Sequence, residues 1–478
     1  MDRRQFLQGI AAGGLASSAL SPLMAAEGSE DKPNIVLIMT DDLGWKEVGC
    51  MGQEKIKTPN LDRLAAQGMI FNDFYAGSAV CAPSRCCLMT GKHGGHAYVR
   101  SNKPVRKEGP IFGGQLPLPA EELTIAETLK ATGYKTGCFG KWGLGATGNS
   151  GDPLDQGFDR FYGYHCQRHA HNLYPRYLVD DREIEELPGN TRGRTGEIYG
   201  PQRIADEMLE FVRENQDDPF FLYYPTLIPH LPLQVPDEYL EQYKGKWPEE
   251  PYNGRSYLPH PTPKACYAAM ISFMDAQVGR LMDLLQQLGL DEKTFVFFTS
   301  DNGTTHLGGQ VDYEFFNSVG PLRGLKGRLY EGGIRVPTIA RWPGRIEPGT
   351  RTDHLAANYD LPATLAEIAG TEFQSNGDGL SFVPEMLGRK QKAPPFLFWD
   401  FSGYGGQVAV RMGKWKGIKT GLQRNPDAPL ELYNLEEDIG ETNNVAKSHP
   451  EVAKRIEKLM LREREVPEVE AFRFGKYE

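Results

Sequence analysis

Short, continuously apolar runs alternate with amphipathic helical segments along the chain from Pro33 to about Gly370. The first run, Asn34 to Met39, has no polar residue after its first position. Such a run is typical of a strand that is buried on both faces, as in a parallel sheet covered by helices. We therefore expect an α/β domain built on a large, mostly parallel sheet flanked by helices. Further strands are expected at residues 136–139, 220–224 and 295–298, and helices at 61–67, 123–131, 204–214 and 265–288.

Polar clusters come shortly after four of the expected strands. In an open α/β sheet, ligands bind outside the carboxyl ends of the strands. We therefore expect the four clusters to converge on one site. They contain Asp41 and Asp42, Lys141, His230, and Asp301 and Asn302.

The chain has 478 residues, which is too many for one compact core, so a second, smaller unit is expected. After Gly370 a polar break is followed by short strand-like runs at 396–401, 407–412 and 415–419 and by a helix at 451–464. We expect a larger domain over residues 32–370 that carries the site. A C-terminal α+β subdomain with an antiparallel sheet is expected over residues 371–478, and we interpret it as a stabilising lobe without catalytic residues.

The first residues are typical of an export signal. The sequence D-R-R-Q-F-L at residues 2–7 is similar to a twin-arginine motif, and an Ala/Gly-rich apolar stretch continues to about Ala26. This stretch is too short and too rich in glycine for a stable membrane span. We expect a signal peptide over residues 1–26, recognition by export machinery, and a periplasmic or secreted protein of a bacterium. An uncleaved, membrane-tethered form is the alternative.

Charge and cysteine content exclude several classes of function. Acidic residues outnumber basic ones by 63 to 53, so no net positive field attracts nucleic acid. An anionic substrate must then be held by a local cluster of cations. The seven cysteines are sparse, odd in number and without a C-x-x-C pair, which argues against both a disulfide framework and a zinc site. A single disulfide pair is the alternative that export leaves open.

The segment from Cys81 to Gly91 reads C-A-P-S-R-C-C-L-M-T-G. It resembles the C-x-P-S-R-x-x-L-x-T-G signature of the type I sulfatases, which belong to the alkaline phosphatase superfamily. The resemblance implies an alkaline-phosphatase-like fold and oxidation of Cys81 to formylglycine by a maturation enzyme. The hydrate of this aldehyde would be the nucleophile. Taken alone, the string is also compatible with a small buried thiol in a turn.

Two further strings, N-I-V-L-I-M-T-D-D and F-T-S-D-N-G, are similar to those with which the family binds one divalent cation. Only oxygen ligands are present apart from the modified cysteine, which suits calcium before magnesium. A solvated turn or a helix N-cap is the alternative for either acidic string alone. The implied ligands are Asp41, Asp42, Asp301, Asn302 and Cys81.

The resemblance also implies a cradle for the sulfate group. Arg85 belongs to the signature and would hydrogen-bond the formylglycine hydroxyls and the metal-site carboxylates. Lys141, His230 and Lys326 would contact the sulfate, with Lys326 or His230 near the leaving oxygen. Cations suit this task because negative charge builds on the sulfuryl oxygens and on the leaving group. The alternatives are a solvated surface charge for either lysine and a structural role for His230.

One position departs from the family pattern. Many sulfatases read G-K-W-H-L-G where this chain has Gly143 in place of the histidine. Glycine has no side chain to donate or titrate, so another residue replaces the histidine, or His230 and Lys326 suffice. The candidates for replacement are His93, His96, His169 and His171.

The resemblance implies a sulfuric ester hydrolase that works by double displacement. The hydrate oxygen attacks sulfur and expels the alcohol, and the second hydroxyl collapses to the aldehyde and releases sulfate. We expect a sulfated carbohydrate as substrate, bound by Arg100, His169 and His171 and bordered by residues 247–263. Two alternatives remain open: a phosphate or phosphonate monoester hydrolase of the same superfamily, and a non-catalytic glycan-binding protein.

Overall fold

The computed structural model of the protein describes residues 32–102, 115–305 and 311–477. The signal peptide expected over residues 1–26 lies outside the described residues. Within the described ranges, no helix combines the length and the apolar character needed to cross a membrane.

A ten-stranded mixed sheet forms the larger part of the molecule, with the order β11-β2-β10-β9-β1-β8-β4-β5-β6-β7. Its centre is parallel: β1 pairs with β8 and β9, and β4 pairs with β8 and β5. The predicted large, mostly parallel sheet is therefore confirmed. The central strands are β1 (Asn34–Asp41), β4 (Lys135–Lys141), β5 (Arg160–Tyr164), β8 (Phe220–Pro229) and β9 (Thr294–Ser300). The outer strands are β2 (Met69–Phe71), β6 (Tyr177–Asp180), β7 (Glu183–Glu186), β10 (Thr338–Arg341) and β11 (Thr350–Thr352), and β3 (Phe74–Tyr75) pairs separately with β12 (Ala356–Ala357).

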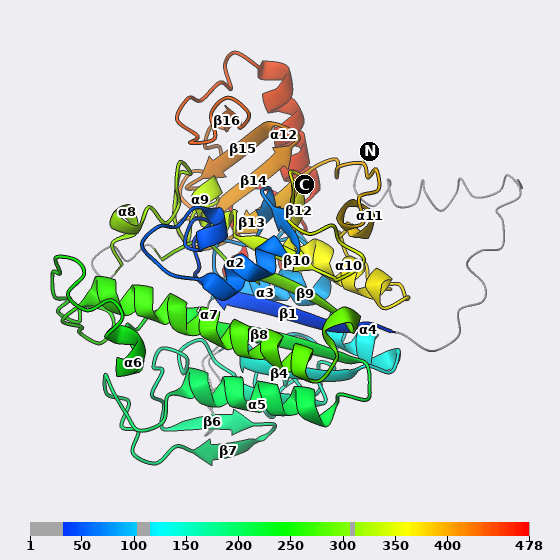
Figure 1. Ribbon diagram of the computed structural model, residues 1–478. Helices are drawn as coiled ribbons and strands as arrows, with labels where there is room; N and C mark the ends of the chain where they lie inside the picture. Colours follow the sequence, from blue (N-terminus) through cyan, green and yellow to red (C-terminus); the bar gives the residue numbers. More distant parts are fainter. Residues whose placement is uncertain (1–31, 103–114, 306–310, 478) are drawn as a thin grey trace, which may run out of the picture.

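Helices cover both faces of this sheet (Figure 1). Successive side chains of a strand point to opposite faces, and β1 follows this rule. Ile35 and Leu37 pack into a core with α3, α4 and α10, whereas Val36 and Ile38 pack into a second core with α2, α5 and α7. The apolar run of β1 is thus explained by burial on both sides. The helices are α2 (Pro59–Ala66), α3 (Cys81–Thr90), α4 (Ile125–Ala131), α5 (Gly200–Glu214), α7 (Pro263–Gln287) and α10 (Leu361–Ile368). Shorter helices are α6 (Asp237–Leu240), α8 (Tyr313–Phe316), α9 (Glu331–Ile334), α11 (Val383–Met386) and the 3-10 turns Gly49–Met51, Asp291–Lys293, Asn358–Asp360 and Glu470–Phe472.

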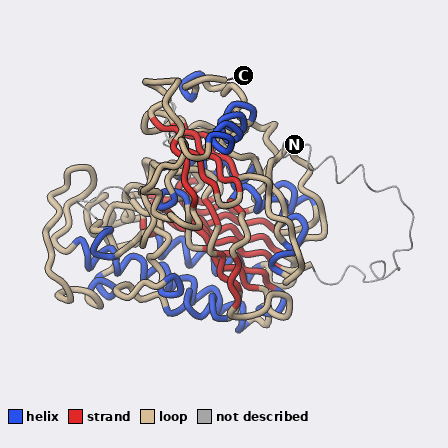
Figure 2. Tube along the Cα trace, turned by 90° about the horizontal axis from the view of Figure 1, so that it is seen from above, coloured by secondary structure: helices blue, strands red, loops and turns tan. Residues whose placement is uncertain are grey.

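A separate four-stranded antiparallel sheet lies at the C-terminal end of the chain, as predicted (Figures 1 and 2). One of its faces packs under α12 through a small core that includes Val408, Val410 and Ile456. The other face packs toward the large domain, where the indole of Trp399 donates to the carbonyl oxygen of Ala76 at 2.9 Å. The elements are β13 (Leu397–Phe401), β14 (Gln407–Met412), β15 (Trp415–Thr420), β16 (Glu431–Asn434) and α12 (Pro450–Arg462).

A buried charge network also joins the two parts. The carboxylate of Glu331, in α9, accepts hydrogen bonds from Tyr75 and Arg335 and from the Nζ of Lys416, in β15, at 2.8 Å. Lys416 also lies 3.0 Å from the carboxylate of Glu441. None of the three charged groups at its centre, Glu331, Lys416 and Glu441, reaches solvent.

Candidate active site

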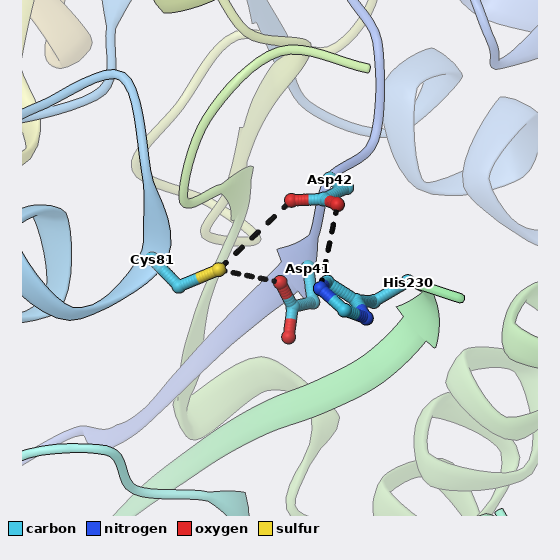
Figure 3. A group of neighbouring side chains, drawn as sticks. All are labelled: Asp41, Asp42, Cys81 and His230. Carbon is cyan, nitrogen blue, oxygen red and sulfur yellow. Dashed lines mark hydrogen bonds and ion pairs between the residues drawn. The ribbon is translucent and has the colours of Figure 1, made fainter. Parts of the chain in front are cut away.

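The four polar clusters lie together at the carboxyl edge of the parallel strands. Asp41 ends β1 and Lys141 ends β4, while His230 and Asp301 directly follow β8 and β9. Adjacent parallel strands end at the same edge of the sheet, so residues far apart in sequence meet here. Figure 3 shows Cys81, Asp41, Asp42 and His230 pointing toward one another.

Cys81 is the first residue of α3, and its thiol points into this cluster. Its Sγ lies 3.1 Å from Asp41 Oδ1, 3.9 Å from Asp42 Oδ1 and 3.6 Å from Lys326 Nζ. Only 1% of the residue is exposed. Burial and the neighbouring carboxylates of Asp301 and Asp41 raise the pKa of the thiol above its ordinary value. The unmodified thiol therefore stays protonated and is a weak nucleophile.

Each aspartate of the cluster has a cationic partner, and all of these groups are buried. Lys141 Nζ lies 2.5 Å from Asp41 Oδ2, and Lys326 Nζ lies 2.6 Å from Asp42 Oδ1. Burial opposes the ionisation of Asp41, but the positive charges around it, led by Lys141, hold its pKa well below the ordinary value. Charge pairing thus keeps Asp41 ionised although its side chain is fully buried.

Arg85 connects the signature helix to the end of β9. Its Nε and Nη2 donate to Asp301 Oδ2 at 3.2 and 2.9 Å, and its Nη1 donates to the carbonyl oxygen of Lys141. Even so, burial and the nearby Asp41 raise the pKa of Asp301 to about 7. Three carboxylates are crowded here, and a cation among them would relieve their repulsion.

Asn302 supplies an independent sign of a metal site. Its Nδ2 donates to Asp42 Oδ1 at 2.8 Å and to the carbonyl oxygen of Gly303 at 2.9 Å. Its Oδ1 is buried and has no hydrogen-bond partner among the described residues. Asp41, Asp42, Cys81 and His230 each offer a ligand atom, and these atoms lie within 4.8 Å of one another. The oxygen-rich donor set fits a hard divalent cation such as calcium.

His230 faces the same cluster with a defined tautomer. Its Nδ1 lies 2.6 Å from the carbonyl oxygen of Leu231, and because a carbonyl oxygen only accepts, Nδ1 carries the hydrogen. Its Nε2 lies 3.7 Å from Asp42 Oδ2. Burial and the charge of Lys326 hold the pKa of His230 well below the ordinary value, so the ring is neutral and Nε2 is an acceptor.

His169 and His171, which were predicted to bind sugar, differ from each other in their surroundings. The half-buried ring of His171 stacks on His230, with centroids 5.2 Å apart and planes at 14°. His169 is buried against the rings of Tyr164 and Tyr177, 4.8 and 4.3 Å away. His171 thus contacts a residue of the cluster, whereas the ring of His169 packs between two tyrosines.

Arg100, the third residue predicted to bind sugar, connects the segment after α3 to the segment after α12. Its Nε, Nη1 and Nη2 donate to the carbonyl oxygens of Ala97, Glu465 and Gly95 at 2.9, 3.0 and 2.8 Å. Only 3% of the residue is exposed. This buried, structural position differs from the sugar-binding role that the sequence suggested, because the donors of the guanidinium are directed to the backbone.

His93 and His96, two candidates for replacing the family histidine, form a separate cluster near the C-terminal subdomain. Their rings stack at 4.3 Å, and His96 Nδ1 lies 2.9 Å from Asp378 Oδ1. His93 also faces Glu463, with 3.7 Å between Nε2 and Oε2. Through these contacts, the two histidines connect the segment after α3 to the C-terminal part of the chain.

The space beside Gly143 is filled by Gln167, which sequence reasoning missed. A Cβ built on Gly143 would lie 2.4 Å from Gln167 Nε2 and 3.8 Å from Arg85 Cδ. The Gln167 side chain is buried, and its Nε2 has no hydrogen-bond partner among the described residues. The pairing of β4 with β5 continues here, since the amide of Gly143 donates to the carbonyl oxygen of His165 at 3.0 Å. This continuation of the pairing beyond Tyr164 brings Gln167 to the position beside Gly143.

Comparison with protein-family models gives two matches. The Sulfatase model matches residues 33–371, and the model of the N-sulphoglucosamine sulphohydrolase C-terminal region matches residues 325–466. Both matches lie within the described fold, and the first contains every residue of the cluster.

Individual proteins give the same result. Human arylsulfatase A is 34% identical over 502 residues, which cover 94% of this chain and 91% of that protein. The dog N-acetylgalactosamine-6-sulfatase is 33% identical over 410 residues, covering 82% of this chain and 73% of that protein. Among solved structures, Ps i-CgsB in complex with k-i-k-neocarrahexaose superposes with a TM-score of 0.77 and 28% identity, covering 93% of this chain and 95% of that one.

Proposed function

This chain belongs to the sulfatase family and is a sulfuric ester hydrolase, and from that premise we propose that it removes sulfate from a sulfated carbohydrate by means of Cys81 in its formylglycine form. The observation that carries the proposal is the position of Cys81 Sγ, within 4 Å of Asp41, Asp42 and Lys326 at the edge of the sheet. A carbohydrate is supported by the similar N-acetylgalactosamine-6-sulfatase and by the neocarrahexaose complex of Ps i-CgsB. An exported, bacterial protein remains part of the proposal because of the sequence of residues 1–26.

Burial beside carboxylates raises the pKa of the unmodified Cys81 thiol above its ordinary value. A buried thiol beside carboxylates does not form the thiolate that attacks electrophiles. The hydrated aldehyde, made by a maturation enzyme, would supply one hydroxyl as nucleophile and a second one whose collapse releases sulfate. Arg85 lies next to this position, and its contacts with Asp301 orient the carboxylate toward the cluster.

The residues that would hold a calcium ion are Asp41, Asp42, Asp301, Asn302 and the modified Cys81. Calcium is preferred to magnesium because the site combines carboxylates with an amide oxygen. A bound ion would polarise a sulfate oxygen and favour ionisation of the attacking hydroxyl.

The two lysines of the site would stabilise the negative charge that develops during the reaction. Burial opposes the charge of Lys326, but the neighbouring carboxylates of Asp42 and Asp41 hold its pKa well above the ordinary value, so it stays protonated. Lys326 is therefore a suitable hydrogen-bond donor to the leaving oxygen, and Lys141 stabilises charge on the sulfuryl oxygens from the β4 side. The neutral His230 offers Nε2 as a proton acceptor beside Asp42.

The test compares the protein made with and without a formylglycine-generating enzyme, together with Cys81→Ala. Mass spectrometry of the peptide that contains Cys81 should show the decrease in mass expected for conversion of the thiol to the aldehyde. The decrease should be seen only in protein made with the formylglycine-generating enzyme. That preparation should release sulfate from N-acetylgalactosamine 6-sulfate, carrageenan oligosaccharides or para-nitrophenyl sulfate. Cys81→Ala should lose about three orders of magnitude in kcat/KM or more, because the nucleophile is gone.

Two arms of the same experiment separate the remaining alternatives. Chelation followed by addition of calcium or magnesium should abolish and then restore activity, with calcium the better ion. Para-nitrophenyl phosphate and a phosphonate monoester should react more slowly than the sulfate ester. Sulfate release by Cys81→Ala, or faster turnover of the phosphorus esters, would contradict the proposal. A converted, calcium-loaded protein that binds sulfated sugars without cleaving them would identify a glycan-binding protein instead.

A further inference from the structure

Tyr404 occupies an unusual backbone conformation at an exposed position. It lies in the five-residue connection between β13 and β14, with the sequence S-G-Y-G-G, and its φ is +50°. Bulky residues rarely adopt this left-handed region, and where they do, the surrounding structure holds them there. The residue is nevertheless 49% exposed. A large aromatic ring is therefore kept at the surface in spite of an unfavourable backbone.

The ring of Tyr404 lies directly on the segment that carries Lys326. A Cβ built on Gly327 would lie 2.9 Å from Tyr404 Cζ, so the ring rests where a side chain at 327 would be. Gln407 fixes this arrangement: its Nε2 donates to the carbonyl oxygen of Gly327 at 2.8 Å, and its Oε1 accepts from the amide of Leu329 at 3.2 Å. Gln407 is fully buried and is the first residue of β14. Its two hydrogen bonds therefore hold the connection between β13 and β14 against the segment that carries Lys326.

A second tyrosine approaches the same site from the large domain. Tyr257, in the segment before α7, lies 5.2 Å from the ring of His171 and 6.1 Å from that of His230, in edge-to-face orientations. It is half-buried. Tyr257 therefore borders the cluster on the side of the stacked histidines, whereas Tyr404 borders it on the side of Lys326.

Both phenols lie beside residues that surround Cys81. Tyr404 packs on the segment that carries Lys326, whose Nζ lies 3.6 Å from Cys81 Sγ, and Tyr257 packs on His230, whose Nε2 lies 3.7 Å from Asp42 Oδ2. Burial raises the pKa of both tyrosines; Lys326 opposes the rise and Asp42 adds to it. Two aromatic side chains from different domains thus border one buried nucleophile.

We infer that Tyr404 and Tyr257 form two walls of the subsite for the alcohol part of the substrate, with the ring of Tyr404 packed against the apolar face of the pyranose. Aromatic rings provide apolar area at low entropic cost and suit a ligand with one apolar face and polar edges. The inference rests on the proposed function, because it requires a sugar ester. It gives the C-terminal subdomain a part in substrate recognition, in contrast to the stabilising lobe that the sequence suggested.

The experiment measures KM and kcat of Tyr404→Ala, Tyr404→Gly and Tyr404→Phe on whichever of the sulfated sugars named above the wild type cleaves fastest. Glycine tolerates a positive φ, so the second variant keeps the test valid if the alanine variant folds poorly. Removing the ring should raise KM about tenfold with kcat changed less than about twofold, and phenylalanine should restore the wild-type KM within about twofold. Inhibition by inorganic sulfate should be unchanged, because sulfate occupies only the cradle of cations.

Ile184→Ala is the matched control, because it also removes an exposed hydrophobic side chain. Ile184 is 41% exposed and lies on β7, the last strand of the large sheet. It should leave KM unchanged. An unchanged KM in both Tyr404→Ala and Tyr404→Gly, or an equal loss in Tyr404→Phe, overturns the assignment of the Tyr404 ring. A parallel weakening of sulfate inhibition also overturns it, since the damage would then lie in the cradle. A wild type that cleaves para-nitrophenyl sulfate but no sugar ester overturns the carbohydrate premise and the inference together.

Discussion

The amide of Gln167 illustrates how much a single side chain can matter in this site. It lies where a side chain at position 143 would be, next to Arg85, and its buried Nε2 has no hydrogen-bond partner among the described residues. A buried donor without an acceptor costs about 1–3 kcal/mol. Such a group is retained where a ligand satisfies it, and the developing charge of a sulfate ester would do so.

We predict that Gln167→Ala lowers kcat on the best sulfate ester about tenfold to a hundredfold, because one hydrogen bond to the reacting group is lost. The melting temperature should stay the same or rise, since a buried unpaired amide is removed. Gln156→Ala is the control: Gln156 Nε2 donates to the carbonyl oxygen of Ser150 at 2.7 Å, so this variant should lower the melting temperature at unchanged kcat. If Gln167→Ala destabilises the fold and leaves kcat intact, Gln167 is merely structural.

At the scale of elements, the central strands could be predicted and the connecting segments could not. Short, mostly apolar runs located β1, β4, β8 and β9. Parallel pairing of these strands then required the polar residues after them to meet. The segment 165–171 follows no period, so tertiary packing alone decides where each of its side chains points. His165 stacks on Phe161 at 4.7 Å, His169 is buried among tyrosines, and His171 stacks on His230.

His165 gives this segment a predictable dependence on pH. Burial lowers the pKa of its ring to about 4, and neither ring nitrogen has a hydrogen-bond partner among the described residues. The unfolded chain takes up a proton near pH 6.5, so the folded protein binds fewer protons between pH 6.5 and about 4. Above pH 6.5, protonation of His165 therefore takes nothing from the free energy of unfolding. As the pH falls from 6.5 to about 4, the free energy of unfolding decreases by up to about 3 kcal/mol because of this histidine.

We predict that His165→Phe reduces the loss of unfolding free energy between pH 7 and pH 5, because the group that acid protonates is absent. The measurement is urea unfolding at both pH values. His449→Phe, at a half-exposed histidine on the C-terminal subdomain, serves as the comparison and should leave the difference unchanged. An identical pH difference in wild type and His165→Phe would show that His165 is not the acid-sensitive group.

At the scale of the whole molecule, the two sheets are joined by buried charge as well as by apolar contact. The change of sequence pattern after Gly370 predicted two parts, but it carried no information on their interface, which depends on residues as distant as Tyr75 and Lys416. The cations around Glu331, led by Lys416, outweigh its burial and hold the pKa of this carboxyl below the ordinary value. Burial raises the pKa of Glu441, on the other side of Lys416, to about 7.

We predict that Lys416→Met destabilises the protein by about 3–5 kcal/mol at pH 7, because two buried carboxylates lose their shared partner. Urea unfolding measures the effect. Lys419→Met is the control in the same strand: its partner Glu457 is 43% exposed, so the loss should be about 1 kcal/mol or less. Similar losses in the two variants would mean that the buried network contributes no more than a surface ion pair.

The depth of Cys81 has a consequence for the biosynthesis of the enzyme. The groups that enclose it come from distant parts of the chain, and Lys326 follows it by 245 residues. With 1% of Cys81 exposed in the folded protein, an oxidising enzyme would reach this side chain only before β9 and the loop after it are in place. The proposed conversion would therefore take place on the nascent or still open polypeptide, and a molecule that folds before it is converted would lack the proposed nucleophile.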